Sequence, residues 1–158
     1  MDRIVLAYSG GLDTSAAIPW LADTYAAEVI TVTVDLGQGR ELEEVRDRAL
    51  ATGALRAHVL DERDAFAREY LVRGLRADST GTGSAAMARA LSRPLIADKL
   101  VQIAGIEDAG IVAHGDTSLM IDAAARTLNA AGIYFARVRL KCADEIQVRA
   151  WTKKLAIE

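Results

Sequence analysis

The stretch RIVLAYSGGLDTS, residues 3–15, decides the fold of this chain. Residues 3–8 form a short, mainly apolar run, which predicts a buried strand. Ser9, Gly10 and Gly11 end that run, and residues 14–26 carry apolar side chains at helical spacing. The stretch therefore predicts a strand, a glycine turn and a helix in direct succession.

The same alternation of strand and helix patterns continues along the chain. We expect further strands at 28–35, 56–60, 111–114 and 133–140. We expect helices at 14–26, 41–52, 61–78, 85–108, 117–131 and 144–157, with a break or a new start near Pro94. Long crossovers between strands imply an α/β fold: one Rossmann-like domain over residues 1–158, with a five-stranded parallel sheet and helices on both faces.

Composition excludes several classes of protein. The chain has 158 residues, which suits one domain, and aromatic residues are only 5%, so the core must be aliphatic. No uncharged apolar run approaches the ~18 residues of a membrane span, and a net charge of −3 argues against electrostatic binding to nucleic acid. A single cysteine, Cys142, excludes an intramolecular disulfide and a multi-cysteine metal site. The first residues predict a strand rather than a secretory signal, so we expect a cytoplasmic protein.

The turn SGGLDTS, residues 9–15, has the properties of a phosphate-binding loop. Consecutive glycines let a phosphate approach the backbone, and successive N–H groups at a helix N-terminus favour an anion. Ser9, Thr14 and Ser15 add hydroxyl donors, while Asp13 is either a helix N-cap or a ligand of Mg²⁺ beside a polyphosphate. No Walker motif is present in this turn.

Other candidate residues follow the second and fourth predicted strands. Ligands of parallel sheets bind beyond the carboxyl ends of the strands, which draws attention to residues 9–14, 35–40 and 115–118. Asp35 is either an acid near a ribose or metal, or a turn carboxylate; Gln38 either faces the nucleotide or lies in a solvated turn. His114 ends a strand, where packing is a simpler role than acid–base chemistry.

Four segments resemble one family in the correct order. AYSGGLDTS (7–15) is similar to the pyrophosphate-binding loop of the N-type ATP pyrophosphatases, and most similar to that of argininosuccinate synthase. The segments at 34–54, 92–104 and 111–117 resemble that family's stretch after strand two, its central helix and its fourth strand with the following turn. The resemblance covers residues 3–118 well and fades afterwards.

The resemblance implies ATP and Mg²⁺ as cofactors and an adenylation reaction. Such enzymes cleave ATP between the α- and β-phosphates, adenylate a carbonyl or ureido oxygen and release pyrophosphate. Asp13 would hold the metal, and Asp13 and Arg93 would assist the reaction. Thr117 and Asp122 would contact substrate. By motif matching, the nucleotide-binding positions would be Ala7, Tyr8, Ser9, Gly10, Gly11, Leu12, Asp13, Thr14, Ser15, Val34 and Gly115. Asp35 and Gln38 join them as candidates because they follow the second strand, not because of the resemblance.

The sequence departs from the family where the family binds amino acids. The family has an aromatic segment that binds citrulline, and this chain has GTGSAAMARA, residues 81–90, in its place. The positions of an Asn and an Arg that hold substrate are Ile121 and Ala125, which can neither bond an amide nor clamp a carboxylate. The family's chains are also more than twice as long. We therefore expect an acceptor other than citrulline.

Two further functions stay open at this stage. One is an adenylating enzyme that ends in sulfur or amine transfer to a different carbonyl compound. The other is a regulatory or degenerate module that binds ATP or AMP without turnover. We expect a small-molecule acceptor or a partner protein that supplies the missing substrate half, no membrane and no nucleic acid. The predicted helix 144–157 would cap the sheet or form the interface of a homodimer.

Overall fold

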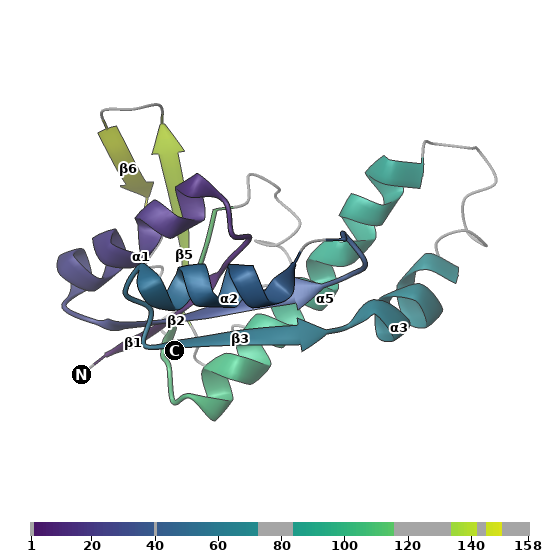
Figure 1. The fold of residues 1–158 in the computed structure, drawn as a ribbon, viewed down its shortest axis with the longest axis horizontal. Coiled ribbons are helices and arrows are strands. Elements are labelled where there is room, and N and C mark those ends of the chain that lie inside the picture. Colours follow the sequence, from purple (N-terminus) through teal and green to yellow (C-terminus); the bar gives the residue numbers. More distant parts are fainter. Residues whose placement is uncertain (1, 40, 73–83, 116–133, 142–144, 150–158) are drawn as a thin grey trace, which may run out of the picture.

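The computed structural model describes residues 2–39, 41–72, 84–115, 134–141 and 145–149. Six strands form one sheet in the order β3-β2-β1-β4-β5-β6 (Figure 1). The strands are β1 Arg3–Ala7, β2 Glu28–Asp35, β3 Arg56–Asp61, β4 Ile111–His114, β5 Tyr134–Lys141 and β6 Glu145–Arg149. The helices are α1 Leu12–Tyr25, α2 Leu42–Ala51, the short α3 Arg63–Ala65, the π-helix η1 Phe66–Leu71 and α5 Ser84–Ile106.

Strands β1 to β5 are mutually parallel, so the α/β fold class is confirmed. The sixth strand corrects both the expected strand number and the expected last helix, because residues 145–149 pair antiparallel with β5. EIQVR alternates polar and apolar residues with a period of two, and its register sets Ile146 opposite Leu140 and Val148 opposite Val138. The remainder of the predicted helix 144–157 lies outside the described residues, as does the helix expected at 117–131.

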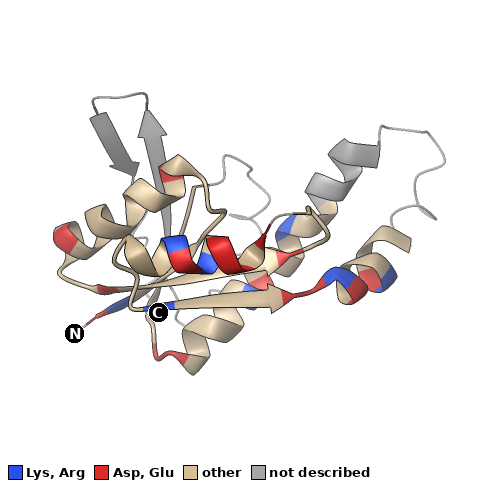
Figure 2. Cartoon of the chain, viewed as in Figure 1, with Lys and Arg blue, Asp and Glu red and all other residues tan. Residues whose placement is uncertain are grey.

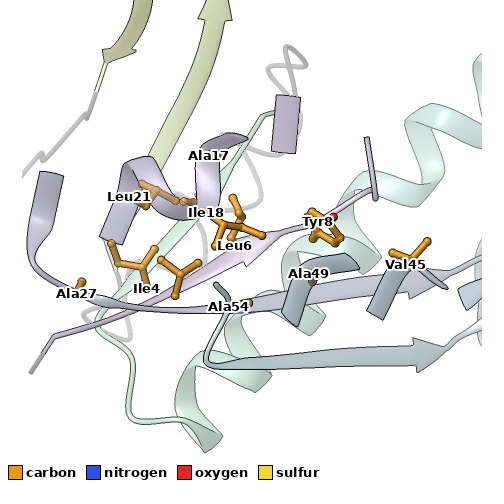
Figure 3. Packing of buried hydrophobic residues seen from close by; sticks show 12 residues of the cluster. Ile4, Leu6, Tyr8, Ala17, Ile18, Leu21, Ala27, Val45, Ala49 and Ala54 are labelled. Atoms are coloured by element: carbon orange, nitrogen blue, oxygen red, sulfur yellow. The ribbon is translucent and has the colours of Figure 1, made fainter. Parts of the chain in front are cut away.

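Helices cover both faces of the sheet, as alternation along β1 dictates. Ile4 and Leu6 lie beside Ile18 and Leu21 of α1, and the same buried cluster includes Tyr8 and, from α2, Val45 and Ala49 (Figure 3). Residues of β1, β2 and β4 on the opposite face pack against α5; this second cluster is Val5, Ile30, Val32, Val34, Leu100, Ile103, Ala104, Ala109 and Val112. The buried hydrophobic residues that the structure describes are aliphatic or alanine apart from Tyr8 and Phe66, as the low aromatic content predicts.

Two helical predictions need correction in their details. Helix α5 continues through Pro94, where we expected a break or a new start. The apolar residues Leu95, Leu100 and Ile103, which follow the proline in the same helix, are buried, so packing against the sheet offsets the hydrogen bond that proline removes. The helix expected at 61–78 begins as α3 and widens into η1. No helix within the described ranges is long and apolar enough to cross a membrane.

Candidate functional site

The order of the strands reverses between β1 and β4, where ligands of open α/β sheets bind. Leu6 pairs with Ala113, and Gly115 directly follows β4, so the ends of β1 and β4 lie at the same edge. The amide of Tyr8 donates to the carbonyl of Val32 at 2.9 Å, which brings the end of β2 to the same edge. The structure thus gathers the loop 9–15, the turn after β2 and Gly115 at the edge where the sequence predicts them.

The glycine loop ends β1 and begins α1 with two different backbone conformations. Gly10 has φ +74°, in the left-handed region that favours glycine, whereas Gly11 is extended with φ −79° and ψ 166°. The amide of Ser15 donates to the Gly11 carbonyl at 3.0 Å, which is the first bond of the helix. The first turn of any α-helix has N–H groups without intrahelical acceptors, and here those of Leu12, Asp13 and Thr14 follow the glycines.

Hydroxyl groups hold the loop in this shape. Ser15 Oγ donates to the Gly11 carbonyl at 2.9 Å, and Thr14 Oγ1 donates to the same carbonyl at 3.2 Å. The Tyr8 hydroxyl lies 2.8 Å from Ser15 Oγ, and Ser9 Oγ lies 3.2 Å from Thr14 Oγ1. These hydroxyls therefore organise the turn in addition to the donor role that the sequence predicts for Ser9, Thr14 and Ser15.

Three residues that the sequence reasoning missed support the loop from other elements. Thr33 of β2 donates from Oγ1 to the carbonyl of Tyr8 at 3.0 Å. Arg48 of α2 donates from Nη1 to the carbonyl of Gly10 at 2.7 Å. Val45 of α2 stands against Gly10, where an added Cβ would lie 3.0 Å from Val45 Cγ2. The helical spacing of Val45 and Arg48 was a usable signal, because residues three apart share one face.

The two residues between the glycines and the hydroxyls are open to solvent. Asp13 is exposed in the first turn of α1, where a negative charge is favourable. Its carboxylate makes no side-chain hydrogen bond or ion pair with the residues that the structure describes. Leu12 is 85% exposed, although it is large and apolar. Both side chains are therefore accessible to a ligand, and binding by either stays a prediction.

The turn after β2 is closed by its own side chains. Asp35 is buried, and its Oδ1 accepts the amide of Gly37 at 2.9 Å. The side-chain amide of Gln38 folds back, accepting the amide of Leu36 at 2.7 Å and donating to the carbonyl of Val34 at 2.9 Å. The predicted nucleotide contacts of Val34, Asp35 and Gln38 thus coincide with a tightly bonded turn, in which all three already have partners.

A charged cluster follows β3 and adjoins that turn (Figure 2). Arg63 binds Asp61 through two nitrogens, at 2.8 Å from Nε and 2.6 Å from Nη2, and its Nε lies 3.4 Å from Asp35 Oδ2. The hydrogen bonds from Arg63 lower the pKa of Asp61 to about 2 and raise that of the guanidinium. An open hollow of ≈ 370 Å³ lies between Arg63 and the residues Asp35, Gly37, Gly39, Leu42 and Glu43.

Helix α5 carries Arg93 past the same edge of the sheet. Lys99 Nζ lies 2.7 Å from Glu62 Oε1, directly after β3, and Arg93 is six residues earlier, about 9 Å further along the helix axis. Arg93 is half-buried, and its Nη1 donates to Ser92 Oγ at 3.3 Å. His114 is buried at the end of β4, as expected for a packed strand-end residue. The predicted substrate residues Thr117 and Asp122 lie outside the described residues.

A second ionic cluster lies at the opposite, amino edge of the sheet. Glu107, only 3% exposed, accepts from Arg56 Nη1 at 3.0 and 3.2 Å and lies 2.7 Å from His58 Nε2. Burial acts to raise the pKa of Glu107, but the bonds from His58 and Arg56 outweigh it, so the net pKa is lowered. Arg3 donates to the Glu107 carbonyl at 2.7 Å. Through these bonds the cluster joins β1, β3 and the end of α5. Because it lies at the edge opposite the glycine loop, we assign it a structural role.

The sheet order and the glycine loop at its switch point define a Rossmann-like α/β class of fold. A solved structure from Methanocaldococcus jannaschii, described as a predicted subunit of tRNA methyltransferase, shares this fold. It has a TM-score of 0.53 and 13% identity over 85% of this chain and 68% of that one.

The chain belongs to the argininosuccinate synthase family, since residues 3–158 match the family model for the argininosuccinate synthase N-terminal HUP domain. It is 52% identical over 116 residues to argininosuccinate synthase of Brevibacillus brevis, which covers 73% of this chain and 28% of that one. It is 50% identical over 117 residues to the enzyme of Nitratidesulfovibrio vulgaris, covering 74% and 30%. The chain thus spans less than a third of the length of these relatives.

Proposed function

We propose that this domain binds ATP by its phosphates on the main chain of residues 9–15 and supports adenylation of an acceptor oxygen. The observation that carries the proposal is the loop itself: two glycines in different conformations lead into a helix whose first-turn amides have no intrahelical acceptor. Membership of the argininosuccinate synthase family supports the same reaction class.

The proposed chemistry transfers AMP. The acceptor oxygen forms a bond to the α-phosphorus, the bond between that phosphorus and the α–β bridging oxygen breaks, and pyrophosphate leaves. Negative charge grows on the leaving pyrophosphate, and fixed N–H donors stabilise such charge without having to reorient. The amides of Gly11 to Thr14 are the donors placed to do this, and Arg93 would add positive charge from α5.

The residues in the loop also suit a magnesium ion. Mg²⁺ prefers oxygen ligands and binds together with substrate phosphates, commonly through one or two carboxylates. Asp13 offers an exposed carboxylate beside Thr14 and Ser15, and it is the residue that would hold the ion. When bound, Mg²⁺ would neutralise part of the phosphate charge.

The acceptor is proposed to be something other than citrulline, because Ile121 and Ala125 replace polar ligands. A small molecule of another kind, or a partner chain that supplies the rest of the substrate site, would take its place. A non-catalytic module that holds ATP or AMP is the second candidate, favoured by those same replacements. Formation of AMP and pyrophosphate with some acceptor would favour the adenylating domain over the non-catalytic module.

Calorimetry with MgATP tests the proposal. We expect wild-type protein to bind MgATP, and Asp13→Asn to weaken binding about tenfold, as for the loss of one charged ligand. Asp23→Asn is the matched control, because Asp23 is exposed on the same helix but remote from the loop. Omitting Mg²⁺ should abolish the difference between the two variants. No heat with millimolar MgATP, or equal affinities for both variants with Mg²⁺ present, would disprove the proposed site.

A further inference from the structure

Arg48 of α2 contacts the glycine loop, although Arg48 and Gly10 are 38 residues apart in sequence. Its Nη1 donates to the carbonyl oxygen of Gly10 at 2.7 Å, a distance typical of a strong charge-assisted bond. The carbonyl belongs to the peptide that joins Gly10 to Gly11, in the centre of the candidate phosphate loop.

A planar trans peptide points its C=O and N–H in opposite directions. Because Arg48 holds the Gly10 carbonyl toward α2, the Gly11 N–H must point away from α2. That N–H donates to Ser9 Oγ at 3.4 Å, a long contact that a stronger acceptor could readily replace. The guanidinium also polarises the peptide, which makes its N–H a better donor to an anion.

The neighbouring contacts show why this peptide needs a support. Gly10 has φ +74°, and glycine reaches many other conformations at little cost. Val45 limits the loop from the side, but an apolar wall cannot set the direction of a peptide dipole. Arg48, one helical turn further along α2, supplies that directional contact.

We propose that Arg48 is a positioning residue that orients the Gly10–Gly11 peptide so that the Gly11 N–H can receive a phosphate oxygen. This rests on the proposed nucleotide site, and Arg48 acts through the Gly10 carbonyl rather than by touching the ligand. Arg48 therefore sets the loop before any nucleotide arrives.

The test compares Arg48→Met and Arg48→Lys with Arg46→Met. Arg46 is exposed on α2 and, two residues away, points to a different side of the helix, so it controls for the loss of a positive charge. Amide NMR spectra of the ligand-free proteins report the Gly11 N–H, and calorimetry reports affinity for MgATP and for pyrophosphate.

Arg48→Met should shift the Gly11 amide resonance in the ligand-free protein. It should also lower the affinity for MgATP and for pyrophosphate about tenfold. Arg48→Lys should keep the Gly11 resonance and the two affinities closer to their wild-type values than Arg48→Met does. Arg46→Met should leave the resonance and the affinities at their wild-type values. An unchanged Gly11 resonance in folded, ligand-free Arg48→Met, or equal loss of affinity in Arg46→Met, would overturn the role. If wild-type protein binds neither ligand, the proposed function fails, while the ligand-free Gly11 resonance still decides whether Arg48 sets the loop.

Discussion

Single residues determine whether the turn between β1 and α1 can present its backbone to an anion. The residues 9–15 predicted a glycine turn between a strand and a helix, because that property is local, but they left open whether Asp13 caps the helix; in the structure Gly11 is the N-cap and Asp13 lies in the first turn. They could not predict Arg48 and Thr33, which reach the loop only after α2 and β2 have docked. The sequence also could not show that the Gln38 side chain bonds to the backbone of Leu36 and Val34. A glutamine between two glycines is equally compatible with a side chain that points into solvent.

The two glycines of the loop should respond differently to a methyl group. Gly10→Ala adds a Cβ at φ +74° and 3.0 Å from Val45 Cγ2, so we expect a loss of about 1–3 kcal/mol in unfolding free energy. Gly11→Ala is the matched control, because its φ of −79° is ordinary and its nearest atom is Ser9 Oγ at 3.4 Å. Urea denaturation measures both; equal losses would contradict the strained conformation of Gly10.

Glu107 should make stability depend on pH in acid. Its pKa is lower in the folded chain than in the unfolded one, so its contribution is complete above the unfolded pKa of about 4.5 and is lost as the pH falls through the folded value. Glu107→Gln should reduce stability by about 2 kcal/mol at pH 7 and flatten the decline in acid. Glu69→Gln, at an exposed residue of η1, is the control. Parallel pH curves for wild type and Glu107→Gln would contradict the assignment.

At the scale of elements, periodicity predicted most of the fold and failed where two periods compete. Residues 145–149 fit a helix when read with Trp151 and Leu155, yet EIQVR also alternates, and the adjacent β5 supplies hydrogen-bonding partners for a strand. Pro94 suggests a helix end from local chemistry, but the burial of α5 against the sheet outweighs it. Both outcomes depend on tertiary contacts that a single sequence does not display.

The docking of α5 near β3 should depend on the pair formed by Lys99 and Glu62. Their side chains are 21% and 16% exposed, so solvent screens the pair less than a surface ion pair. A double-mutant cycle with Lys99→Met and Glu62→Gln should give a coupling free energy of about 1 kcal/mol. The same cycle on Arg68 and Asp64, exposed and 3.9 Å apart, should give a value near zero. Equal coupling in both cycles would contradict a specific tether.

At the scale of the whole molecule, this chain has the glycine loop of residues 9–15 but carries Ile121 and Ala125 where the family resemblance implies polar substrate ligands. We therefore expect the purified protein to form no argininosuccinate from citrulline, aspartate and MgATP. Mass spectrometry of the reaction mixture measures this, with an authentic full-length argininosuccinate synthase as positive control. Detectable product from this chain would show that Ile121 and Ala125 do not prevent substrate binding. The expected homodimer also stays a prediction, although residues 145–149 of the helix that suggested it form β6.

The most direct test of the account is to titrate ¹⁵N-labelled protein with MgATP and follow the backbone amides by NMR. We predict that the largest shifts fall on the amides of residues 10–15, with smaller shifts at Gly115 and the turn after β2, and that pyrophosphate reproduces the shifts in the loop. Saturable binding that leaves residues 10–15 unchanged while other amides shift would contradict it.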